Sequence, residues 1–141
     1  MTVIATEGQY TRFSSLVKWL DAPEKPELFK DVLTMNDAAA TLTLGTMLGK
    51  VTATGKFKVC VQTAVDGSNT PAALYIGDLF GATADTTLVA ATDTKVLALV
   101  RGKAVVAKDA LKLDSSFGTA AQKQTAYDAL KAIGILAETA A

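Results

Sequence analysis

The feature that most constrains the fold is a short segment of strict alternation directly after a turn. In Lys56–Gln62, Phe57 and two valines alternate with lysine, cysteine and glutamine side chains. Successive side chains of a β-strand point to opposite faces, so this pattern predicts a strand with its aromatic and valine residues on one face. Thr54 and Gly55 form a turn sequence before it. The segment therefore predicts a hairpin with Thr46–Ala53.

Further short strands are predicted across the middle of the chain, from about Val32 to Leu113. We expect them at Ala72–Phe80 with a bulge at Gly77, at Thr87–Ala90, at Lys95–Arg101 and at Ala104–Ala107. Asp66–Pro71 is a cluster of turn-forming residues. Lys95–Arg101 is apolar on both faces, which predicts a central strand that is covered on both sides.

The C-terminal part predicts one helix. Thr119 and Gln122 have the spacing of a capping box, in which each side chain bonds to the backbone of the other. An apolar face follows at spacings of four and three, at Ala126, Leu130 and Ile133. Gly134 is placed to end the helix in the left-handed conformation. We expect Glu138–Ala141 to be a frayed tail.

The first 31 residues differ in character from the rest. Pro23 and Pro26 oppose a continuous helix or a central strand, so we expect residues 1–31 to form an N-terminal arm and linker. Residues 32–141 then form a β-rich domain with the C-terminal helix. The composition of the arm leaves two readings open: it packs on its own domain, or it docks on a partner. The residues of the arm that we expect to contact a partner are Val3, Ile4, Tyr10, Phe13, Leu16 and Trp19.

The composition argues against catalysis. The chain has no histidine, which removes Ser-His-Asp and Cys-His catalysis and imidazole metal sites. Its single cysteine, Cys60, cannot form an internal disulfide or a thiolate zinc cage. Most aspartates lie at predicted turns or strand ends, where their side chains bond to local backbone. We therefore expect no catalytic residues, no metal and no cofactor.

The charge balance and the apolar runs also limit the partners. Fourteen basic residues balance fourteen acidic ones, which argues against nucleic acid as a direct partner. No apolar run approaches the roughly 20 residues that span a bilayer, so we expect no membrane partner. The first residues lack a basic segment followed by an apolar one, so we expect no signal peptide and an intracellular site of synthesis.

One block carries most of a resemblance to a known family. It reads Leu44-Gly45-Thr46-Met47-Leu48-Gly49-Lys50-Val51-Thr52-Ala53-Thr54-Gly55-Lys56-Phe57. This block resembles the opening of the lambda-type bacteriophage head decoration proteins. Three later features follow in the same order as in that family: the Asp66-Gly67-Ser68 turn with its strand, the Val96–Val106 strands around Arg101-Gly102, and the Ala129–Ile135 helix end. Gly81–Thr94 departs from the family pattern as an insertion.

The resemblance implies a β-clip-like domain with a helix and an extended N-terminal arm. It implies a homotrimer on the outer surface of the expanded phage head, where the arm reaches the lattice of the major capsid protein. It also implies stabilisation of the head against the pressure of packaged DNA, after synthesis in the host cytoplasm. Under this hypothesis the segment from Val3 to Thr6 adds a strand to the lattice, and deletion of Met1–Leu20 leaves a folded domain that no longer binds capsids.

Two other classes stay open at the level of sequence. β-clip folds also include nucleotide hydrolases, so this fold alone does not exclude an enzyme. The neutral charge and the Thr- and Ala-rich strands also fit another phage surface or adhesion module. Stabilisation by nucleotides would favour the first alternative. Binding to sugars or cells without affinity for capsids would favour the second.

Overall fold

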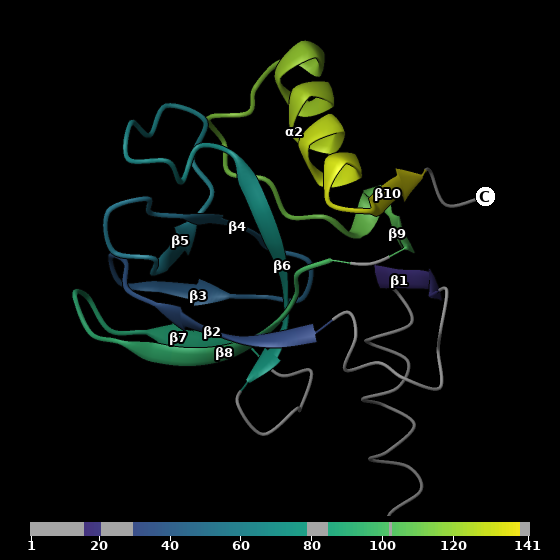
Figure 1. Cartoon of the computed structure of the whole chain (residues 1–141). Coiled ribbons are helices and arrows are strands. Elements are labelled where there is room, and N and C mark those ends of the chain that lie inside the picture. Colours follow the sequence, from purple (N-terminus) through teal and green to yellow (C-terminus); the bar gives the residue numbers. More distant parts are fainter. Residues whose placement is uncertain (1–15, 21–29, 79–84, 102, 139–141) are drawn as a thin grey trace, which may run out of the picture.

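The computed structural model describes residues 16–20, 30–78, 85–101 and 103–138 of the 141-residue chain (Figure 1). The strands are β1 (Val17–Leu20), β2 (Lys30–Met35), β3 (Ala40–Leu42), β4 (Met47–Lys50), β5 (Phe57–Val59), β6 (Pro71–Asp78), β7 (Thr86–Leu88), β8 (Thr94–Leu99), β9 (Ala104–Ala107) and β10 (Ile135–Glu138). The helices are the short 3₁₀ helix η2 (Lys108–Ala110) and the α-helix α2 (Ala120–Ala132). Within the described residues, the predicted mainly-β fold with a helix near the C-terminus is confirmed. The extended arm lies outside them.

Five strands close into a barrel in the order β2-β5-β4-β6-β8. β8 pairs antiparallel with both β2 and β6, which confirms the prediction that this apolar segment is a central strand. The register between β6 and β8 shifts between Tyr75 and Gly77, where the sequence predicted a bulge. The segment predicted around Thr87 forms β7, which pairs with β3 in a separate two-stranded sheet.

The predicted hairpin is present as β4 and β5. Leu48 pairs with Val59, and Gly55 in the intervening turn has a φ of 72°, which glycine adopts without a steric penalty. β5 is shorter than the predicted strand, because the chain leaves the ladder after Val59. The backbone N–H of Cys60 then donates to the carbonyl of Met47 at 3.0 Å.

The buried side chains form two hydrophobic cores. One lies within the barrel and under the β3–β7 sheet, and consists of Leu33, Met35, Leu42, Leu48, Ala73, Tyr75, Leu88, Val96 and Ala98. The other joins the barrel to α2, β1, β9 and β10, and includes Leu16, Val17, Met47, Cys60, Leu74, Leu99, Val106, Phe117, Leu130 and Ile135. Phe57 and Val59 of β5 pack against the first core, and Cys60, the residue directly after β5, lies in the second. The alternation in the sequence therefore separates the two faces as predicted.

The third sheet brings both ends of the described chain together. β9 pairs antiparallel with β1 and parallel with β10. β10 includes Glu138, opposite Ala107, so the prediction that Glu138 belongs to a frayed tail is wrong. The local sequence does not predict β10, because its partner β9 precedes the helix and the two strands pair in parallel. The expected boundary after residue 31 falls inside β2, and β1 also belongs to the fold.

The helix α2 has the caps that its sequence predicted. The N–H of Gln122 donates to Thr119 Oγ1 at 3.2 Å, and the N–H of Thr119 donates to Gln122 Oε1 at 3.1 Å. At the other end Gly134 has a φ of 93°. Ala126 and Leu130 are buried against the second core. The capping box therefore fixes where the helix begins, and the apolar face fixes how it packs.

Replacement of Thr119 by alanine should remove the N-terminal cap. We expect Thr119→Ala to lower the free energy of unfolding by about 1 kcal/mol, the usual cost of a lost cap. For a domain of this size that corresponds to a fall in Tm of about 4 °C. Urea unfolding followed by circular dichroism measures the change. Thr119→Ser keeps the hydroxyl and is the matched control, and equal stability of both variants would contradict the cap.

Candidate functional site

Two of the six expected contact residues lie within the described chain. Leu16 is completely buried in the second core, so in this structure it packs on its own domain. Trp19 lies in β1, where its backbone is paired with Val105 of β9. Val3, Ile4, Tyr10 and Phe13 lie outside the described residues. Of the six, only Leu16 and the backbone of Trp19 can therefore be placed, and both belong to the domain itself.

The described residues contain little reactive chemistry. No group of three or more Cys, Asp or Glu side chains among them is arranged to hold a metal ion. Cys60 is buried, and burial raises the pKa of its thiol to about 12, with a smaller contribution from the charge of Asp114. At neutral pH this thiol stays protonated and is a poor nucleophile. No helix among the described residues is long and apolar enough to cross a membrane.

The turn between β7 and β8 projects apolar side chains into solvent. We call Val89, Ala90 and Ala91 the tip. All three are exposed, and Val89 has 63% of its surface accessible. Ala91 has a φ of 54°, a left-handed conformation that is uncommon for residues other than glycine. Its N–H donates to the carbonyl of Asp37 at 3.0 Å, which holds this conformation in place.

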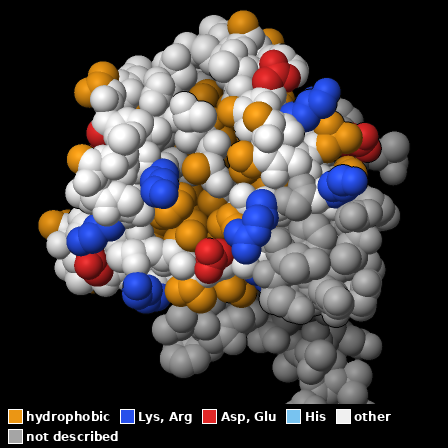
Figure 2. Space-filling view, viewed as in Figure 1, with side chains coloured by type: hydrophobic (Ala, Val, Ile, Leu, Met, Phe, Trp, Pro, Cys, Tyr) orange, Lys and Arg blue, Asp and Glu red, His pale blue; other side chains and the backbone are white. Residues whose placement is uncertain are grey.

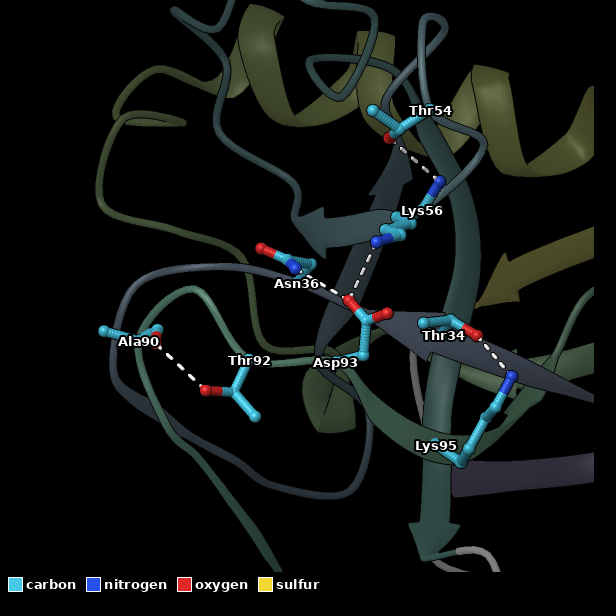
Figure 3. Close-up of polar contacts among 8 residues, drawn as sticks. All are labelled: Thr34, Asn36, Thr54, Lys56, Ala90, Thr92, Asp93 and Lys95. Carbon is cyan, nitrogen blue, oxygen red and sulfur yellow. Dashed lines mark hydrogen bonds and ion pairs between the residues drawn. The ribbon is translucent and has the colours of Figure 1, made fainter.

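Asp93 anchors the tip to the barrel (Figure 3). Its Oδ1 accepts from the side-chain amide of Asn36 at 2.7 Å and from the ammonium group of Lys56 at 2.9 Å. These two hydrogen bonds hold the pKa of Asp93 below its usual value. Thr92 adds a bond within the turn, because its hydroxyl donates to the carbonyl of Ala90. The anchor thus joins the start of β8 to the end of β2 and the start of β5.

A groove of about 260 Å³ lies between α2 and the loop before β6. Its lining is uncharged and consists of Gln62, Asn69, Thr70, Pro71, Phe117, Ala121, Gln122, Thr125, Ala126 and Ala129. The loop that forms one wall is fixed by Asp66, whose Oδ1 accepts from the hydroxyl and the N–H of Ser68. These bonds, with a smaller contribution from Lys58, lower the pKa of Asp66 to about 2.

The same loop lies close against the barrel. A Cβ atom at Gly49 would lie 2.0 Å from the carbonyl oxygen of Ser68, so a side chain at Gly49 would push the loop away. The same loop carries Val65, which is 99% exposed. The loop therefore lies close against Gly49 at Ser68 and exposes a valine elsewhere along its length. Figure 2 shows hydrophobic side chains in a hollow on one face, with lysine, arginine and acidic side chains interspersed around it.

A comparison with known protein families shows which family has this sequence. A model of the family described as Bacteriophage lambda head decoration protein D matches residues 20–135. The chain belongs to this family. The match covers β2 to β9 and α2, so it includes the barrel, the tip and the groove. No curated protein matches the chain.

Membership of the head decoration protein D family confirms the resemblance that the block Leu44–Phe57 indicated. It places the protein among structural components of the phage head, a family of capsid decoration proteins and not of enzymes. The virion capsid is therefore where the protein is found. Because such a protein acts through surfaces, the tip and the groove are its candidate functional sites within the described residues.

Sequence reasoning missed both surfaces as sites. The sequence indicates only an insertion with a short strand at Gly81–Thr94, and only a turn at Asp66–Pro71. The aspartates gave a partial signal, because turn aspartates bond to nearby groups. The bonds from Asp93 to Asn36 and Lys56 span 57 and 37 residues, however, and nothing in the local sequence indicates them.

The low pKa values of Asp66 and Asp93 predict a dependence of stability on pH. The pKa values of both carboxyl groups lie below the ordinary 3.8, so the stability that they contribute is present above that pH and is lost as the pH falls through the folded-state pKa, which is about 2 for Asp66. We expect the Tm of the natural chain to fall more steeply over this range than that of Asp66→Asn, which has no carboxyl group at this position. Thermal unfolding between about pH 2 and pH 5 measures the two slopes. Parallel curves would contradict the role of Asp66.

Proposed function

We propose that the protein binds the outer surface of the expanded phage head as a homotrimer and stabilises the head against the pressure of packaged DNA. The observation that carries this proposal is the family match over residues 20–135, together with a fold that is mainly β with one helix near its C-terminus. The partner is the lattice of the major capsid protein. Synthesis in the host cytoplasm precedes addition to the head.

The N-terminal arm is the proposed attachment to the lattice. Because Leu16 is packed in the domain's own core, the arm consists of residues 1–15, with Val3, Ile4, Tyr10 and Phe13 as its contacts. Trp19 in β1 then lies close to the point where the arm leaves the domain. A strand from Val3 to Thr6 would add main-chain hydrogen bonds to the burial of the apolar side chains.

Three arms on one trimer strengthen the attachment. Ordering an arm costs backbone entropy, so a single arm with a few apolar contacts binds weakly. Once one arm of a trimer is bound, the other two are held near their own sites at a high effective concentration. The homotrimer thus converts a weak contact into a lasting one, which is what resistance to internal pressure requires.

The charges support a partner made of protein. The chain has 14 basic and 14 acidic residues, and the face drawn in Figure 2 has both signs interspersed, with no basic patch. A nucleic-acid surface needs a cationic excess that follows the phosphates. We therefore propose that the protein contacts neither the packaged DNA nor a membrane.

Deletion of residues 1–15 tests the attachment. The shorter chain keeps β1 and Leu16, unlike the deletion of residues 1–20 that the sequence alone would recommend. We expect its Tm to stay within a few degrees of the full chain, because both cores are intact. We expect it to lose binding to expanded, undecorated heads of its own phage, measured by co-sedimentation.

A second variant keeps the length of the arm and changes its order. In it, residues 1–15 are scrambled at constant composition, which separates the specific contacts of the arm from its bulk. We expect the scrambled variant to bind heads as poorly as the deletion. Binding by either variant at the level of the full chain would contradict the arm proposal. Unfolding of both would show that the segment packs on its own domain.

A further inference from the structure

The barrel has one junction with very little backbone pairing. β2 pairs with β8 along its whole length, and β4 pairs with β5 from Leu48 to Lys50. Between β2 and β5, by contrast, the described residues form a single ladder pair, Met35 with Phe57. We call this contact of β2 with β5 the seam. Strand edges carry N–H and C=O groups that need partners, so a seam this short depends on bonds of another kind.

Two further hydrogen bonds cross the seam beside this pair. The N–H of Asn36 donates to the carbonyl of Phe57 at 3.0 Å. The N–H of Val59 donates to Oδ2 of Asp37, also at 3.0 Å, so a carboxylate takes the place of a backbone acceptor at this edge of β5. Asp37 is itself held in position, because its carbonyl accepts from the N–H of Ala91 in the β7–β8 turn.

Lys56 adds a crossing made by side chains alone. Its ammonium group lies 2.9 Å from Oδ1 of Asp93, and the same oxygen accepts from the side-chain amide of Asn36 (Figure 3). Lys56 directly precedes β5, whereas Asn36 directly follows β2 and Asp93 directly precedes β8. Because β2 and β8 are paired with each other, only the bond from Lys56 crosses the seam. The bond from Asn36 positions the carboxylate that receives it.

We propose that the seam is a built-in opening of the barrel, and that the bonds Lys56–Asp93 and Val59–Asp37 are the latch that holds it closed. The other ladders of the barrel run over several residue pairs, so parting any of them breaks more hydrogen bonds. Proteins open in units with separate free energies, and the unit with the fewest bonds opens first. The latch is easily released, because an exposed ion pair contributes little to stability.

The opening has a limited extent. Met35, Phe57 and Val59 belong to or pack against the first core, so parting of the seam admits water there. The second core, beneath α2, stays covered, because its strands keep their ladders. Every group in the seam and the latch belongs to one subunit. The inference is therefore independent of the proposed role on the phage head.

Hydrogen exchange of single amides, followed by NMR on the full chain at low urea concentrations, tests the opening. After correction for intrinsic rates, we expect the N–H groups of Asn36 and Val59 to exchange faster than the amides of β8. We also expect their exchange to depend only weakly on urea, because parting of the seam exposes little surface. The amides of β8 should show the full urea dependence of global unfolding. Equal protection and equal urea dependence in both sets would overturn the proposal.

Lys56→Met and Lys95→Met are a matched pair that tests the latch. Each removes one lysine hydrogen bond and keeps an apolar stem. The ammonium group of Lys95 donates to the hydroxyl of Thr34 at 2.7 Å, but this bond joins β8 to β2 and stays intact when the seam parts (Figure 3). We expect Lys56→Met to speed exchange at Asn36 and Val59 about 3-fold, the effect of an exposed ion pair. We expect Lys95→Met to leave both amides unchanged.

Asp37→Ala removes the other half of the latch. The N–H of Asn36 is the reporter here, because its own acceptor, the carbonyl of Phe57, is not altered. We expect its exchange to rise about 10-fold or more, the usual effect of losing a hydrogen bond to a charged group. Equal effects of the two lysine variants on the seam amides would overturn the latch, and so would unchanged exchange at Asn36 in both Lys56→Met and Asp37→Ala.

Discussion

β8 forms backbone hydrogen bonds along both edges, with β2 on one side and β6 on the other, and the rest of the fold depends on this strand. It closes the barrel, and it is also the wall between the two cores. Val96 and Ala98 face the core inside the barrel, while Leu97 and Leu99 face the core beneath α2. A strand with this position must be apolar on both faces, because each face is covered by a different core.

That dual role explains which parts of the fold can be predicted from sequence. The apolar composition of Lys95–Arg101 predicts a covered strand. The capping box of Thr119 and Gln122 predicts where the helix begins. Each signal is local. The pairing of β10 with β9 cannot be predicted from local sequence, because the whole helix α2 separates the two strands along the chain. Local sequence does not predict β1 for a similar reason, because its partner β9 lies more than 80 residues later in the chain.

The candidate sites also combine features that local sequence predicts with features that depend on distant parts of the chain. The sequence indicates a turn at Asp66–Pro71, because turn residues have local preferences, and an insertion with a short strand at Gly81–Thr94. It does not show that Asn36 and Lys56 converge on Asp93, nor that the loop after Asp66 and the helix α2 enclose a groove. Those features depend on closure of the barrel. Leu16 illustrates the reverse case, since an apolar residue suited to a partner's groove fits its own core equally well.

The fold of this domain is compatible with a role on the phage head. A barrel with two cores supports two small surfaces, the tip and the groove. Weak contacts of this kind become effective when many copies are held together on one lattice. Decoration of a phage head provides that arrangement, and the family match over residues 20–135 supports it.

The most direct test of this account is the number of copies bound to expanded, undecorated heads of the parent phage at saturation. Charge-detection mass spectrometry of heads with and without the purified chain gives this number. The account predicts saturable binding in multiples of three, with heads that withstand higher temperatures after packaging than undecorated heads do. Absence of binding, or binding that rises without saturation, would contradict the proposal that this protein decorates the capsid.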